Sequence, residues 1–240
     1  QTENLRSCLE IMESKTSFKC TYCGKSFQRE RTLQVHMCEP KRRHLQKNEK
    51  WVQNGYIVFK RFYEIHQRNT KQKTYDQFCE SSYYNAFVKF GRYMMHTSPL
   101  YPEKYIDYVI LSKVKLDHWS RDDLYEQYLK DTLKTEPVEM ALRRSIATMM
   151  DWAQEQNVQW SDYFRLVNTS RAVQQIQSGQ ISPWLILGCD AGKKMLKSFT
   201  DEQLQMVQTY IDPEFWRNKF KNYPADQLFV QETAKEARIE

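Results

Sequence analysis

Apolar residues recur at helical spacing through most of this 240-residue chain. The clearest run lies between residues 42 and 68, where one stripe contains Leu45, Val52, Tyr56, Phe59 and Tyr63. Spacings of three, four and seven residues are typical of one face of an α-helix. Gly55 is the only Gly or Pro in this stretch, so the pattern predicts one long helix that is aromatic on one face and basic elsewhere.

Local start signals predict further helices in the rest of the chain. Thr74 has the position of an N-cap, and Thr200 with Gln203 forms a capping box, in which two side chains bond free backbone N–H groups. Ser120 and Asp123 resemble the same box, and prolines stand at several other predicted starts. The predicted helices span 82–96, 103–111, 122–133, 137–156, 160–167, 171–177, 204–210, 215–223 and 226–236, with a short one after Thr74.

Composition narrows the fold class. Gly and Pro are scarce, at 6 and 7 residues, which argues against sandwiches and barrels with many tight turns. Aromatic residues make up 14% of the chain and provide large side chains for a core. No apolar run approaches the roughly 20 residues that cross a bilayer, and no secretory signal is recognised, so we expect a cytoplasmic or nuclear protein.

Basic residues are concentrated near the N-terminus. Residues 15–75 hold 15 Lys and Arg against four Asp and Glu, an excess of 11 positive charges. The rest of the chain holds 21 basic and 26 acidic residues and is therefore mildly acidic. This asymmetry predicts a polyanionic partner for the N-terminal part.

Three of the six cysteines cluster in the basic part, whereas Cys8, Cys79 and Cys189 are scattered. The segment 18–36 has the pattern C-x2-C-x3-F-x5-L-x2-H, which begins at Cys20 and ends at His36. Two cysteines two residues apart can reach one tetrahedral ion from a hairpin turn. A segment this small has too little apolar surface to fold alone, so metal binding is expected to supply its folding energy.

This segment resembles the classical Cys2His2 zinc finger, which implies a small ββα module with one structural Zn²⁺ ion. Cys20, Cys23 and His36 match three of its ligands, but no histidine stands three to five residues after His36. We expect Cys38 as the fourth ligand, provided that the helix frays before Pro40. His44 and a water molecule are the alternatives.

The zinc-finger resemblance also implies nucleic-acid contacts. In classical fingers the residue before the helix and its third and sixth residues meet bases in the major groove. With His36 as the seventh helical residue, these positions hold Arg29, Thr32 and Val35, and the second position holds Arg31. Basic residues that follow the finger are expected to add phosphate contacts, namely Lys41, Arg42, Arg43, Lys47 and Lys50. The alternative is a finger that binds protein.

The expected fold is mainly α, with a small ββα zinc finger at the N-terminus followed by a multi-helix all-α body. Residues 1–16 are expected to form a tail or a short helix over Leu5–Met12, and residues 17–41 the finger. Residues 42–73 form the basic aromatic helix or linker, and residues 74–240 the all-α helical domain.

Two segments further resemble zinc-finger proteins of large myovirus-type tailed bacteriophages. They are residues 35–43, VHMCEPKRR, and residues 87–92, FVKFGR. The resemblance implies the cytoplasm of an infected bacterium, and it brings no established activity.

Three functional hypotheses follow. The first is a DNA-binding accessory factor in phage replication, transcription or DNA processing, with the helical body on a protein partner. The second is an interaction adaptor or an inhibitor of a host machine, and the third is an enzyme assembled from distant residues, for which no motif argues. Residues 188–194 fall one residue short of a phosphate loop and end in Lys, so phosphate binding is not assigned there.

Overall fold

The structure is a computed structural model that describes residues 17–67 and 72–239. The helix expected over Leu5–Met12 lies outside the described residues. Contacts divide the chain into two compact units. Unit 1 comprises Gln1–Thr97 and Val114–Ser120, and unit 2 comprises Ser98–Lys113 and Arg121–Glu240.

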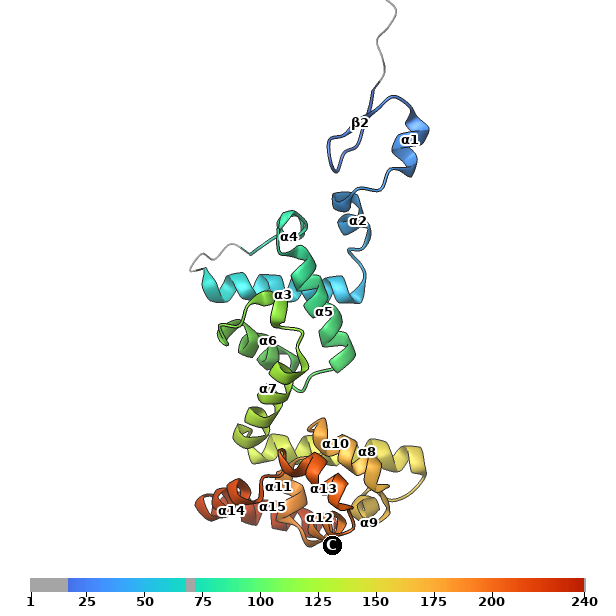
Figure 1. The fold of residues 1–240 in the computed structure, drawn as a ribbon. Coiled ribbons are helices and arrows are strands. Elements are labelled where there is room, and N and C mark those ends of the chain that lie inside the picture. The colour runs from blue at the N-terminus through green and yellow to red at the C-terminus, as the bar shows by residue number, and fades with distance from the viewer. Residues whose placement is uncertain (1–16, 68–71, 240) are drawn as a thin grey trace, which may run out of the picture. The chain divides into compact units, whose positions relative to one another are not determined.

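Unit 1 contains the N-terminal hairpin and the first helices (Figure 1). Strands β1 (Phe18–Lys19) and β2 (Ser26–Phe27) pair antiparallel, with Phe18 opposite Phe27. Its helices are α1 (Glu30–Val35), α2 (Glu39–Leu45), α3 (Lys50–His66), α4 (Tyr75–Glu80), α5 (Tyr84–Thr97) and the 3-10 turn η1 (Leu116–His118).

The core of unit 1 forms where α3 crosses α5 (Figure 1). Glycines sit at the crossing, because a Cβ atom on Gly91 would lie 2.2 Å from the Trp51 carbonyl oxygen. A Cβ atom on Gly55 would likewise lie 2.9 Å from the Phe87 carbonyl oxygen. Around this close approach the rings of Phe59, Phe78, Phe87, Phe90 and Trp119 are buried.

The single helix predicted from residue 42 to residue 68 is wrong, because the structure divides it into α2 and α3. The chain turns over residues 46–49 without any Gly or Pro. Tertiary bonds explain the break: Arg43 on α2 donates to the Cys79 and Ser81 carbonyls at the end of α4, whereas α3 packs along α5. These two sets of contacts require different directions for α2 and α3.

Unit 2 is built from helices alone within the described residues. They are α6 (Pro102–Leu111), α7 (Asp122–Thr135), α8 (Val138–Gln156), η2 (Trp160–Asp162), α9 (Tyr163–Leu166), α10 (Thr169–Gln177), α11 (Pro183–Gly188), α12 (Asp190–Lys197), α13 (Asp201–Gln208), α14 (Pro213–Asn222) and α15 (Pro224–Glu236). The large core cluster surrounds α11, whose Trp184, Leu185 and Ile186 are buried.

Local capping chemistry sets many helix starts. The capping boxes at Thr74 and Thr200 are present, each with the backbone and side-chain bonds that define the motif. The box predicted at Ser120 is wrong: Arg121 is the N-cap residue of α7 and makes no side-chain cap bond. In the predicted box the Asp123 carboxylate would accept from the Ser120 backbone N–H. It instead accepts from the Arg121 guanidinium.

The predicted fold class is confirmed: a two-stranded hairpin near the N-terminus precedes a helical body. The boundary expected between residues 73 and 74 lies inside unit 1, where α3, α4 and α5 pack together. In residues 17–67 and 72–239, no helix has both the length and the apolar character that crossing a bilayer requires.

Candidate metal centre

The candidate metal centre begins in the hairpin. β1 leads into Cys20, and the chain turns through Tyr22 and Cys23 before β2. The Cys20 N–H donates to the Lys25 carbonyl at 2.8 Å, and the Gly24 N–H donates to the Cys20 carbonyl at 2.9 Å. Gly24 has a φ of +72°, a left-handed conformation that glycine adopts without steric cost. The turn therefore brings the two cysteines to one side of the hairpin.

Helix α1 carries the chain across the hairpin to His36. The helix ends at Val35, and His36 is extended, with φ −65° and ψ 121°. The expectation that His36 is the seventh residue of the helix is therefore wrong, because α1 stops one residue earlier. The His36 ring packs against Phe27, with ring centroids 4.7 Å apart, which holds the imidazole over the hairpin.

The early end of α1 also positions Cys38. This residue is the N-cap of α2, with φ −95° and ψ 162°, and Pro40 lies in the first turn of that helix. An extended turn at His36 followed by a new helix returns the Cys38 thiol to the hairpin. The fraying on which the Cys38 prediction depended is present, and its cause is the start of α2.

Four side chains converge at this point. The ligand atoms of Cys20, Cys23, His36 and Cys38 all lie within 4.8 Å of one another. The Cys20 and Cys38 Sγ atoms are 3.9 Å apart, and Cys23 Sγ is 3.3 Å from His36 Nε2. A tetrahedral zinc ion with Zn–S bonds of about 2.3 Å needs sulfur atoms about 3.8 Å apart. The three thiols and one imidazole thus fit a structural metal ion.

The hairpin turn also favours a thiolate at this site. The backbone N–H of Cys23 points at the Cys20 sulfur and lowers the pKa of the Cys20 thiol. Burial, in contrast, raises the pKa of Cys38. Cys20 is the most enclosed of the four, at 3% exposed, whereas Cys23 is exposed.

His44, the alternative fourth ligand, lies outside this cluster. Its ring packs against Tyr22, with centroids 5.3 Å apart, and its Nε2 atom is 4.0 Å from the Asp76 carboxylate. The ring therefore occupies the contact between the hairpin turn and α4. The sequence carries no local signal for this contact, because it joins residues more than 20 positions apart in the chain.

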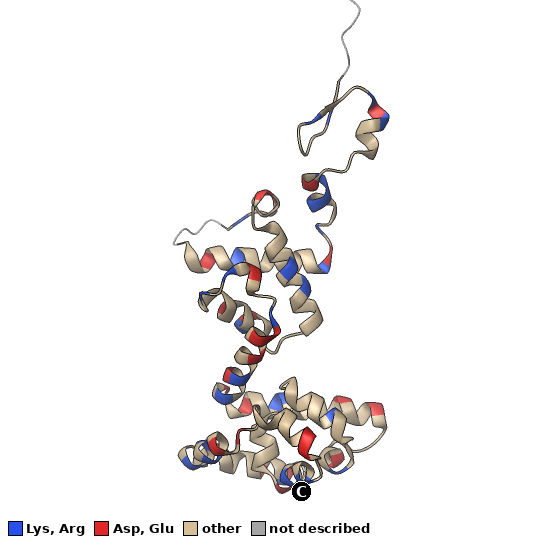
Figure 2. Cartoon of the chain, viewed as in Figure 1, with Lys and Arg blue, Asp and Glu red and all other residues tan. Residues whose placement is uncertain are grey.

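The predicted base-contacting residues form an open face on α1. Arg29, Arg31 and Thr32 are exposed, and Val35 is 76% exposed. Within the described part of the chain, the guanidinium groups of Arg29 and Arg31 make no hydrogen bond or ion pair. Figure 2 shows Lys and Arg residues on the hairpin module and on α2 and α3.

The predicted phosphate contacts on α2 have different surroundings. Lys41 donates to the His36 carbonyl at 3.1 Å, and Arg42 pairs with Glu39. Arg43 is largely enclosed, with its side chain 15% exposed and its guanidinium 4.3 Å from the Tyr84 ring centroid. The structure thus uses Arg43 to join α2 to α4 and α5. Lys47 and Lys50 remain exposed.

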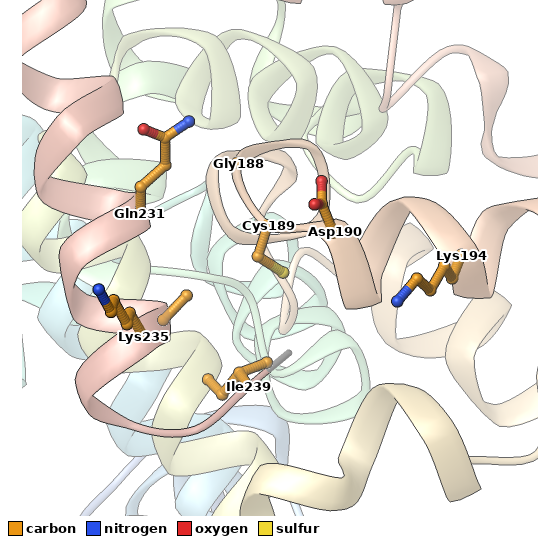
Figure 3. Close-up of a pocket in the computed structure, with 8 residues that line it drawn as sticks. Gly188, Cys189, Asp190, Lys194, Gln231, Lys235 and Ile239 are labelled. Carbon is orange, nitrogen blue, oxygen red and sulfur yellow. The ribbon is translucent and has the colours of Figure 1, made fainter.

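The stretch 188–194 is a corner between two helices. Cys189 is the only residue between α11 and α12, and its Sγ atom accepts from the Gly192 N–H at 3.4 Å. A neighbouring pocket of about 380 Å³ is lined by Cys189, Lys194 and Lys235, the last from α15 (Figure 3). A phosphate loop needs several consecutive loop N–H groups, which one connecting residue does not provide.

Known protein families, curated proteins and solved structures offer no match to this chain. Function is therefore inferred from the residues and their geometry.

Proposed function

We propose that this protein is a zinc-finger nucleic-acid-binding accessory factor, with DNA favoured over RNA and no catalytic role. The observation that carries the proposal is the pairing of a preformed Cys3His cluster with an open arginine face on α1. Cys20, Cys23, His36 and Cys38 would hold one Zn²⁺ ion, and the bound ion would fix α1 against the hairpin.

The exposed face of α1 suits a nucleic-acid groove. Arg29 and Arg31 stand unpaired in the described structure, next to Thr32. Arginine donates two parallel hydrogen bonds to a guanine edge, which makes Arg29 the proposed base reader. One finger covers about three base pairs, so further contacts are needed for stable binding. Lys47, Lys50 and the exposed Arg42 are proposed to supply phosphate contacts.

The helical body is proposed to bind a protein partner. The chain outside residues 15–75 is mildly acidic, and residues 138–239 of the body form a large hydrophobic core of their own. The sequence resemblance to bacteriophage zinc-finger proteins supports a role in phage replication, transcription or DNA processing, in the host bacterial cytoplasm. A eukaryotic protein of this kind would act in the nucleus.

A second candidate function is a protein-binding finger, in an adaptor or an inhibitor of a host machine. The observation that favours it is apolar exposure beside the metal cluster: Val35 is 76% exposed, Met37 58% and Tyr22 43%. Exposed apolar side chains of this kind suit a protein surface better than a phosphate backbone.

Fluorescence anisotropy with duplex, single-stranded and RNA probes at two salt concentrations tests the proposal. We expect binding that weakens as salt rises, and Arg29→Ala should cost about 1–3 kcal/mol at a preferred guanine. Arg217→Ala is the control, because Arg217 is an exposed arginine of unit 2. A full chain that contains zinc and binds none of the probes would reject nucleic-acid binding and favour the adaptor.

A further inference from the structure

Three lysine ammonium groups of unit 1 are each held over a tyrosine ring. Lys47 Nζ lies 5.1 Å from the Tyr75 centroid, and Lys60 Nζ lies 5.0 Å from the Tyr56 centroid. Lys73 Nζ lies 4.6 Å from the centroid of Tyr63. We call these six residues the lysine–tyrosine row.

The members of the row form one connected surface. The rings of Tyr56 and Tyr75 meet edge to face with centroids 5.4 Å apart. The Tyr56 hydroxyl donates to the Lys73 carbonyl at 2.8 Å. Tyr56, Lys60 and Tyr63 follow one another at four and three residues, so they share one face of α3. The row therefore joins α3, the α2–α3 turn and the start of α4.

The tyrosines give the lysines fixed supports. Tyr75 is 8% exposed, and its hydroxyl donates to the Arg43 carbonyl at 2.7 Å. The electrostatic attraction between an ammonium group and an aromatic face restricts the flexible lysine stem. Tyr75 is buried, and one face of each ring carries a lysine ammonium group. The row therefore presents positive charge.

The charges of the row are largely free. Lys47, Lys60 and Lys73 form no ion pair with the described part of the chain. Two acids lie near the row. Glu64, four residues after Lys60 on α3, pairs with Arg61. Asp76 lies near Tyr56, whose pKa is raised first by burial and then by the Asp76 charge. The Asp76 side chain is 78% exposed, so water weakens its attraction for the lysine ammonium groups but leaves a negative charge beside the row.

A chain of rings leads from the finger to the row. Tyr22 in the hairpin turn meets His44, and His44 meets Tyr75 with centroids 6.1 Å apart. The hairpin turn of the finger and the row therefore belong to the same unit and are linked through the His44 ring.

We propose that the lysine–tyrosine row binds the sugar–phosphate backbone of the nucleic acid whose bases the finger contacts. This inference rests on the proposed function and enlarges its footprint beyond α1. Lysine acts as a point charge for phosphate, and backbone contacts fix register without reading sequence. Contacts of this kind would supply the affinity that a single finger lacks.

The test uses the full zinc-loaded chain and removes charge without removing packing. Lys47→Met and Lys60→Met keep apolar stems over Tyr75 and Tyr56 but lose the ammonium groups. The double variant should bind duplexes of unrelated sequence more weakly by the same factor. Its log–log salt slope should shrink by about one unit for each contact, so about two. Lys47→Arg with Lys60→Arg should keep the wild-type slope.

Two further variants complete the design. Asp76→Asn removes the Asp76 charge beside the row and should tighten binding, which is opposite to the effect of the methionine variants. Lys197→Met is the matched control, because Lys197 is an exposed lysine of unit 2. Thermal melting of each variant shows whether the fold is retained, and the Asp76→Asn result tests the row even where a methionine variant melts early.

Each outcome decides between the two proposals. If the double methionine variant keeps the wild-type slope and Asp76→Asn binds no more tightly, while Arg29→Ala weakens binding, the row is refuted and the finger proposal stands. If the wild-type chain binds no nucleic acid, the proposed function fails and the row fails with it.

Discussion

A buried ion pair joins Glu136 and Arg144 in unit 2. The Glu136 side chain is 1% exposed and that of Arg144 is 11% exposed. Arg144 Nη2 donates to Glu136 Oε1 at 2.7 Å, and its second Nη atom donates to the other carboxylate oxygen. Arg144 Nε also donates to the Gly179 carbonyl at 2.7 Å.

The pair joins four segments of unit 2. Glu136 is the C-cap of α7, Arg144 lies on α8, and Tyr101 is the N-cap of α6. Tyr101 hydroxyl donates to the carboxylate at 3.2 Å, and so does the hydroxyl of Ser182, the N-cap of α11. Glu136 therefore accepts four hydrogen bonds, and its removal affects every one of these segments.

Glu136→Ala should lower the free energy of unfolding of unit 2 by about 3–5 kcal/mol, because it leaves the Arg144 guanidinium buried without a counter-charge. Glu136→Gln keeps the shape and some hydrogen bonds, so its cost should be smaller, about 1.5–3 kcal/mol. The double variant Glu136→Met with Arg144→Met should be less destabilised than Glu136→Ala, because it leaves no buried charge unpaired.

Native-state hydrogen exchange read by peptide mass is the suitable assay, since a chain of two units need not unfold in one step. Peptides from α8 should lose protection in Glu136→Ala, while peptides from α3 in unit 1 serve as the internal reference and should be unchanged. A loss below about 1 kcal/mol in α8, or an equal loss in α3, would refute the reasoning about desolvated charge.

Three further predictions concern the metal, the helix crossing and pH. Cys38→Ser should lower zinc affinity while His44→Ala should leave zinc content at one ion per chain by elemental analysis; the reverse result would make His44 the ligand. Gly91→Ala should lower stability by about 1–3 kcal/mol in thermal melting, because its Cβ would meet backbone atoms that cannot rotate away, and an unchanged Tm would contradict the close crossing. The hydrogen bond from Arg42 lowers the pKa of the Glu39 carboxyl. The ionised carboxylate therefore stabilises the folded chain, by under about 1 kcal/mol at this exposure. This stabilisation is present above the unfolded pKa of about 4.3 and is lost as the pH falls through the folded pKa. The free energy of unfolding, measured by urea titration, should therefore fall less steeply with decreasing pH in Glu39→Gln than in the wild type below about pH 4.3. An equal dependence on pH in the two proteins would contradict this.

The sequence by itself determined the features that depend on neighbours along the chain. The spacing of Cys20, Cys23 and His36 identified the candidate metal module, and the boxes at Thr74 and Thr200 marked two helix starts. These signals act over three to sixteen residues, through turn geometry and backbone N–H groups. Scarce Gly and Pro, with apolar residues at helical spacing, were enough to predict the fold class.

Only the tertiary structure decided the features that depend on distant residues. Cys38 is the fourth member of the candidate metal cluster because α2 begins there and brings its thiol to the hairpin. His44 instead lies between Tyr22 and Asp76. The break between α2 and α3 has no local signal, since Arg43 is bonded to carbonyls about 36 residues further along the chain. A helical pattern shows which face of a segment is apolar, but it does not show which other segment packs against that face. Side-chain contacts between distant segments therefore decided which basic residues remain open to a ligand and which ones hold the fold together.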